Sequence, residues 1–151
     1  MISPAPLTGP PPAAGPAPPA SQAPRSRVPA WIVWSLRVTA TLHLAGVLGQ
    51  AVIGGLFVTG EVDLLTWHNV NAGASTALVG LQLAAAVALW RPARGPAWPL
   101  WVSAVQLVLM NAQVLLGMQR MLAPHVPLAM VIFGVAVSMT AWTWRTGRGR
   151  S

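Results

Sequence analysis

The chain has 151 residues, of which 54% are hydrophobic and only 7% are charged. Soluble domains carry roughly 25% charged residues, so a chain this poor in charge cannot coat a globule with a solvated surface. The lipid bilayer is therefore the expected solvent and partner. The absence of cysteine excludes disulfides, thiolate metal sites and thiol catalysis. The net charge of +7 does not indicate nucleic-acid binding, because the arginines lie at the ends of apolar runs and form no basic patch interleaved with aromatics.

Residues 1–29 hold ten of the fifteen prolines, together with alanine, glycine and serine. A segment with so few large apolar side chains cannot bury enough surface to offset the entropy of ordering it. We expect a disordered tail and not a signal peptide, because a basic start and an apolar stretch are both missing. Residues 146–151 form a second, short basic tail.

Four apolar runs follow, over residues 31–58, 64–90, 97–118 and 124–144. Each is long enough to cross a hydrocarbon core of about 30 Å at the rise of an α-helix. Turn-like sequences rich in glycine, proline and arginine separate the runs. The prediction is an all-α domain over residues 30–145, a transmembrane four-helix bundle with up-down-up-down topology.

The positions of the arginines predict how this bundle lies in the membrane. Eight of the nine arginines precede or open the first run, fill the middle loop or follow the last run. The other side has only Arg120, together with both acids, Glu61 and Asp63. The positive-inside rule therefore predicts cytoplasmic termini in a multi-pass protein of the cell membrane. All eight tryptophans lie at the ends of the runs, where membrane boundaries are expected.

The two halves of the predicted bundle share short patterns. A shift of 63 residues aligns QAVIG, which begins at Gln50, with QVLLG, which begins at Gln113. A shift of 57 residues aligns His68 with His125, and each histidine begins an H-x-x-x-A pattern. Internal duplication is one explanation, and chance matching in Ala/Val/Leu-rich sequence is the other.

His68 and His125 each lie in the first turn or two of a run that starts on the outer side. An antiparallel bundle places two such imidazoles at nearly the same depth on different helices. That arrangement suits bis-histidine haem ligation, in which the iron takes one nitrogen from each side of the macrocycle. The plainer interpretation is that both histidines are interfacial polar residues among lipid headgroups.

A four-helix unit with QVLLG in an odd helix, and a histidine just after the next outer loop, resembles one half of haem A synthase. It is also similar to short four-helix bacterial membrane proteins with the same plan. The resemblance covers residues 42–144. It implies a b-type haem near the outer face, with His68 and His125 as axial ligands to the iron. The chain departs from haem A synthase in being a single unit, and in carrying its acids, Glu61 and Asp63, in a loop. This departure argues against synthase chemistry more than against haem binding.

Two further residues are candidates for the haem site. Arg120 ends the third run on the same side as both histidines, and a guanidinium is well suited to the propionates of a haem. A salt bridge to Glu61 or Asp63 is the alternative for this arginine. Asn71 shares the face of His68 to within about a turn, so it is a second candidate for a propionate contact.

Deeper polar side chains are expected to face the bundle interior, because unpaired polar groups are costly in hydrocarbon. His43 and Gln106 lie at similar depths in the first and third runs, so a hydrogen bond between them is expected. A second haem ligand or a proton relay is the alternative for His43. Gln50 and Gln113 continue these two stripes toward the outer side and are expected to hold helices together.

The predicted function is haem binding for electron transfer or haem handling, with a membrane redox partner or a second copy as the protein partner. No nucleophile triad, phosphate loop or paired intramembrane carboxylate is present, so no catalytic residue is predicted. The alternative is a cofactor-free accessory or scaffold subunit of a membrane complex, whose polar stripes serve helix packing. A small transporter is less favoured, because membrane-embedded carboxylates and mid-span Gly/Pro breaks are missing.

Overall fold

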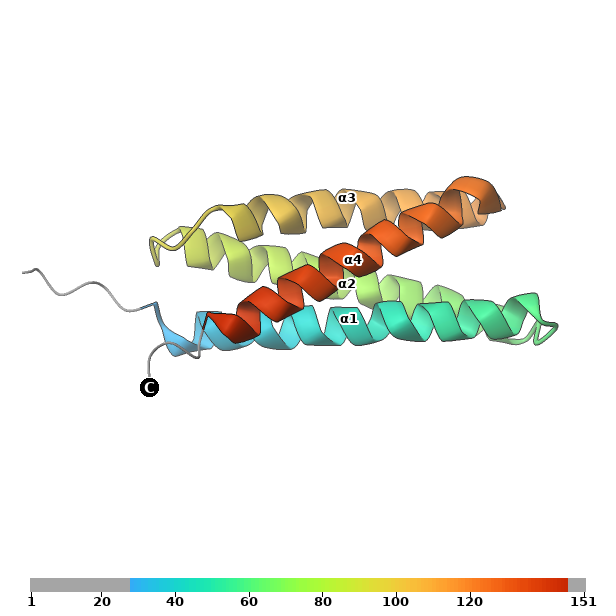
Figure 1. Ribbon diagram of the computed structural model, residues 1–151, viewed down its shortest axis with the longest axis horizontal. Coiled ribbons are helices and arrows are strands. Elements are labelled where there is room, and N and C mark those ends of the chain that lie inside the picture. Colours follow the sequence, from blue (N-terminus) through green and yellow to red (C-terminus); the bar gives the residue numbers. More distant parts are fainter. Residues whose placement is uncertain (1–27, 147–151) are drawn as a thin grey trace, which may run out of the picture.

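The computed structural model describes residues 28–146. Within them the chain forms four α-helices that run alternately in opposite directions (Figure 1). Their bounds are α1 Ala30–Val58, α2 Leu64–Trp90, α3 Trp98–Met118 and α4 Leu122–Arg145. The predicted all-α four-helix bundle is confirmed, and the predicted spans end close to the observed helix ends. The predictions for the tails over residues 1–29 and 146–151 lie almost wholly outside the described residues.

All four helices are long and apolar enough to cross a membrane. The shortest, α3, has 21 residues, which extend about 30 Å at the rise of an α-helix. Large apolar side chains such as Trp31, Val52 and Val108 lie on the outside of the bundle, whereas His43 and Gln106 are buried inside it. The interior also holds apolar clusters around Ile32 and Val79, so it is the apolar exterior that sets this bundle apart from a water-soluble one. The chain is therefore a multi-pass membrane protein.

The helices form a four-membered ring in which α1 and α3 each contact both α2 and α4. Helices α1 and α3 are diagonal partners, as are α2 and α4, and neither diagonal has close backbone contacts. The α1–α2 and α3–α4 turns lie at one end of the bundle, which we call the histidine end (Figure 1). The start of α1, the α2–α3 loop and the end of α4 lie at the other, which we call the terminal end.

The buried positions of the two halves coincide. Four buried residues of α2 have buried counterparts 57 positions later in α4: Ser75, Val79, Gln82 and Ala86 match Ile132, Ala136, Met139 and Thr143. Three buried residues of α1 have buried counterparts 63 positions later in α3: Leu36, Ala40 and His43 match Pro99, Ser103 and Gln106. These are the two shifts of the sequence patterns. This coincidence of buried positions favours one helical hairpin used twice, with its two copies on opposite sides of the bundle axis.

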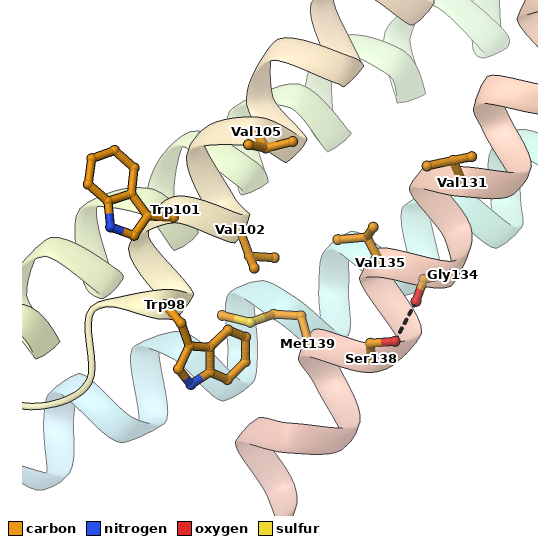
Figure 2. Close-up of a pocket in the computed structure, with 9 residues that line it drawn as sticks. All are labelled: Trp98, Trp101, Val102, Val105, Val131, Gly134, Val135, Ser138 and Met139. Carbon is orange, nitrogen blue, oxygen red and sulfur yellow. Dashed lines mark hydrogen bonds between the residues drawn. The ribbon is translucent and has the colours of Figure 1, made fainter.

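The two hairpins differ in how closely their helices approach. Figure 1 shows α4 crossing the bundle obliquely, from a position beside α3 at the histidine end to one beside α1 at the terminal end. Helices α3 and α4 leave between them an apolar groove of about 520 Å³ (Figure 2). Its walls include the indoles of Trp98 and Trp101, and its one hydroxyl, that of Ser138, donates within α4 to the carbonyl of Gly134. Neither predicted haem ligand lines this groove.

Candidate site at the histidine end

His68 and His125 occupy equivalent places at the histidine end. Each lies near the start of an even-numbered helix, and its imidazole packs against a glycine of the preceding helix. A Cβ atom on Gly54 would lie 3.5 Å from Cε1 of His68, and one on Gly117 would lie 3.2 Å from Cε1 of His125. Glycine at both positions therefore lets an imidazole approach the backbone of the neighbouring helix.

A glutamine one turn before each glycine holds the same histidine segment. Nε2 of Gln50 donates to the backbone carbonyl of His68 at 3.1 Å, and Nε2 of Gln113 donates to that of His125 at 3.0 Å. The glutamine, glycine and histidine of each half thus make the same two contacts. Chance matches in apolar sequence have no reason to share these contacts, so the geometry favours duplication.

Helix length at the histidine end accounts for the difference between the shifts of 63 and 57 residues, because the two turns themselves are alike. Both have the same backbone hydrogen bonds, with the N–H of Gly60 donating to Phe57 in the first turn and that of Arg120 donating to Gly117 in the second. Gly60 has a φ of 120° and Arg120 a φ of 57°, so both occupy left-handed backbone conformations. The first hairpin is longer on either side of its turn, and it extends farther past its histidine (Figure 1).

One nitrogen of each histidine ring is enclosed without a partner. Nδ1 of His68 and Nδ1 of His125 are buried and make no hydrogen bond with the described residues. The two rings project from the diagonal helices α2 and α4, near the same end of the bundle. Bis-histidine ligation of a haem uses one imidazole nitrogen from each of two helices. His68 and His125 are therefore the residues that would hold such a group.

A metal ion held by protein side chains alone has a different requirement. Among residues 28–146, no three histidine, cysteine or acidic side chains come together. A haem iron needs only two axial ligands from the protein, because the macrocycle supplies the other four. The described residues therefore offer no cluster of three such side chains for a free metal ion.

The two residues predicted to assist the propionates differ in their surroundings. Nδ2 of Asn71 donates to the carbonyl of Gly46 at 2.8 Å and to Oε1 of Gln50 at 2.6 Å, so this amide joins α2 to α1. Arg120 is exposed in the turn between α3 and α4, at the same end as both histidines. Asn71 thus shapes the first hairpin, whereas the Arg120 guanidinium lies at the surface.

The second hairpin lacks the Asn71 amide. Leu128 stands 57 positions after Asn71, at the equivalent place on α4. Oε1 of Gln113 is accordingly enclosed without a partner, whereas Oε1 of Gln50 accepts from Asn71. The polar network beside His68 is therefore more complete than the one beside His125.

His43 and Gln106 meet deeper in the bundle, across the α1–α3 diagonal. Their Nε2 atoms lie 3.0 Å apart and both side chains are fully buried, as the sequence predicts. The two remaining polar atoms of the pair, Nδ1 of His43 and Oε1 of Gln106, are buried without a partner among the described residues. His43 lies two turns before Gln50 on α1, about 10 Å from the level of His68 by helix rise. It is therefore not part of the paired-histidine site.

The sequence patterns missed a second buried pair. Nε2 of Gln82 on α2 donates to Oγ of Ser103 on α3 at 3.0 Å, and both side chains are buried. The spacing of Gln82 could have revealed it. Gln82 lies four helical turns after His68, so both side chains lie on the same face of α2. The equivalent residues of the other half are Met139 and Ala40, which form an apolar pair.

Comparisons with protein families, with curated proteins and with solved structures give no match for this chain. The fold defines a multi-pass membrane protein of four helices, with one histidine near the start of α2 and one near the start of α4, at the same end of the bundle.

Proposed function

We propose that this protein binds one b-type haem at the histidine end, with His68 and His125 as axial ligands. The observation that carries the proposal is the equivalent seating of the two rings. Each packs against a glycine, each belongs to a segment held by a glutamine, and each has an enclosed Nδ1 without a partner. Enclosed polar atoms without a partner are costly and occur elsewhere in the bundle too, so the support comes from the matched seating of the two rings in both halves.

The surrounding residues take distinct roles in this proposal. Gln50 and Gln113 orient the two histidine segments through their carbonyls, and Asn71 supports Gln50. Arg120 is the candidate for a propionate contact, because its guanidinium is exposed at the same end. A haem at this site supplies reversible one-electron chemistry. With both axial positions held by histidine, electron transfer is the favoured activity, and haem handling is the second.

The membrane setting of the proposal comes from the sequence. The arginines outside the histidine end far outnumber the single Arg120 at that end. By the positive-inside rule the termini lie in the cytoplasm and the haem lies near the outer face of the cell membrane. The resemblance of the QVLLG-and-histidine pattern to one half of haem A synthase supports the same ligand pair. A membrane redox partner is expected to approach from the histidine end.

An absorbance spectrum tests the proposal. We expect the full-length protein, purified in detergent from haem-replete cells, to show a sharp alpha band after reduction with dithionite. Both His68→Ala and His125→Ala are expected to abolish this band, because each removes one axial ligand. A folded but colourless wild-type protein would contradict the proposal.

Two variants serve as matched controls. His43→Gln changes the third histidine of the chain and is expected to keep the band, because His43 contacts Gln106 and lies at another level. Arg120→Gly places glycine where the first hairpin has Gly60, so it relieves the left-handed backbone while removing the guanidinium. Weaker haem retention in Arg120→Gly would therefore report a propionate contact and not backbone damage.

The competing function is a cofactor-free scaffold or accessory subunit. The observation that favours it is that Gln50, Asn71, Gln106 and Gln113 all make hydrogen bonds between helices. Such bonds stabilise a membrane bundle without any ligand. A scaffold predicts that His68→Ala and His125→Ala leave spectrum and stability unchanged while association with another membrane protein is lost.

A further inference from the structure

A cationic site lies at the other end of the bundle, on the seam between α1 and α4. Arg37 is half-buried there, seven residues into α1 and thus about 10 Å from its start by helix rise. Its Nε donates to the backbone carbonyl of Thr143 at 3.1 Å. This bond fixes the guanidinium against α4 and leaves both terminal nitrogens to face elsewhere.

Two indoles flank this guanidinium. Cζ of Arg37 lies 5.2 Å from the ring centroid of Trp34 and 5.1 Å from that of Trp144, which is within cation–π range. The two rings stand edge to face with centroids 5.9 Å apart. Nε1 of Trp144 donates to the hydroxyl of Thr41 at 3.1 Å, which fixes this ring on α1. The guanidinium is therefore held between two exposed indoles and the backbone of α4, an arrangement that we call the recess, and not on a freely moving side chain.

This cation has no acidic side chain near it. The whole chain contains only two acids, Glu61 and Asp63, and both lie in the turn at the histidine end. Arg37 lies at the terminal end, separated from them by most of the length of α1. A charge inside a spanning helix is costly unless it is paired, so its counter-ion is expected to come from outside the chain.

We propose that Arg37, flanked by Trp34 and Trp144, binds the phosphate of a membrane phospholipid. The depth fits, because tryptophans mark the headgroup region where lipid phosphates lie. The donor chemistry also fits, because the planar guanidinium can give two parallel hydrogen bonds to one phosphate. The lipid would then lie across the seam that joins the first helix to the last. This proposal is independent of the haem proposal.

Lipid-dependent thermal stability tests the site. The delipidated full-length protein in detergent is titrated with phosphatidylglycerol, with diacylglycerol of the same chains, or with inorganic phosphate. We expect phosphatidylglycerol alone to raise Tm, because the phosphate supplies the charge and the chains hold it at the membrane surface. An equal rise with diacylglycerol would overturn the proposal. A rise in Tm with inorganic phosphate but not with phosphatidylglycerol would show that the site binds free phosphate, which would contradict a phospholipid as the source of the bound phosphate.

Arg37→Gln is expected to weaken the lipid affinity derived from this titration by about tenfold or more, as loss of a charge-assisted hydrogen bond predicts. Arg91→Gln is the matched control, because Arg91 also lies over one indole, that of Trp90, at 4.9 Å, but is exposed. Arg91→Gln should keep the wild-type affinity. Equal losses of lipid affinity in both variants would show that phosphatidylglycerol responds to general surface charge, which would contradict the proposal.

A second variant covers the case in which Arg37→Gln fails to fold. Trp144→Leu keeps the guanidinium but removes one wall of the recess and the bond to Thr41. We expect it to lower the affinity for phosphatidylglycerol, and native mass spectrometry should find less co-purified phospholipid than in the wild type. Unchanged lipid retention in Trp144→Leu would contradict the proposed recess.

Discussion

His43 and Gln106 join the diagonal helices α1 and α3 through a direct contact of 3.0 Å between their Nε2 atoms. These helices share no close backbone contact, so the two side chains span the centre of the bundle. Both are fully buried, and the contact occupies the same level in the two repeats. A hydrogen bond at this position fixes how the two hairpins face each other.

The His43–Gln106 hydrogen bond predicts that substitutions of the two residues have coupled effects on stability. We expect His43→Leu and Gln106→Leu each to lower the free energy of unfolding by about 1 kcal/mol, because each leaves a buried polar partner unsatisfied. The double variant should lose less than the sum, with a coupling energy of about 0.6 kcal/mol, which is typical of bonds inside membranes. Unfolding in SDS measures all four proteins. Additive losses would show that the contact contributes nothing of its own.

The Gln82–Ser103 pair can be tested against the other half of the molecule. Ser103→Ala should destabilise the bundle by about 1 kcal/mol, because it leaves the buried Gln82 amide without its acceptor. Adding Gln82→Met should restore most of the stability, because methionine and alanine form the equivalent apolar pair at Met139 and Ala40. If the double variant is less stable than Ser103→Ala, the two halves are not interchangeable at this level.

Close approach of α1 and α2 depends on a glycine. A Cβ on Gly46 would collide with Oγ of Ser75, so Gly46→Ala is expected to cost about 1–3 kcal/mol through overpacking. Gly55→Ala is the matched control on the same helix, because a Cβ there meets nothing within 4 Å. It should be neutral or slightly stabilising, since alanine favours helices.

Ser75 supplies the compensating change for this overpacking. Combining Gly46→Ala with Ser75→Ala removes the colliding oxygen and leaves the Ser75 Cβ at an ordinary distance of 3.6 Å. The double variant should therefore recover most of the stability lost in Gly46→Ala. Unfolding in SDS again gives the comparison. Failure to recover would place the cost of Gly46→Ala somewhere other than this contact.

Asn71 is expected to stabilise the first hairpin more than its neighbour Asn69 does. Asn71→Leu removes two hydrogen bonds to α1 and copies the leucine of the second hairpin, so we expect a loss of about 1–2 kcal/mol. Asn69→Leu should have little effect, because Asn69 is exposed. Hydrogen exchange near His68 should also rise in Asn71→Leu alone. Equal effects of both substitutions would contradict a specific role for Asn71.

The sequence predicted the site only in part. His68 and His125 could be found because each lies in the first turn or two of an apolar run and each half repeats the glutamine-glycine pattern. The hydrogen bonds from Asn71 to α1 could not be predicted from the sequence, because they depend on which face of α2 meets α1. The Gln82–Ser103 pair was hidden for the same reason, since neither residue belongs to a repeated motif. Arg37 was read only as a topology signal, because its indole partner Trp144 lies on the far end of the chain.

The amino-acid sequence by itself determined the number, length and alternation of the helices. Transfer of a span into the bilayer depends on a free energy summed along that span, which local composition already contains. The tertiary structure alone decided that Gln82 pairs with Ser103, that Asn71 bonds to α1, and that α3 and α4 separate into a groove. Those outcomes depend on helix rotation and crossing, which are set by contacts between residues far apart in the chain.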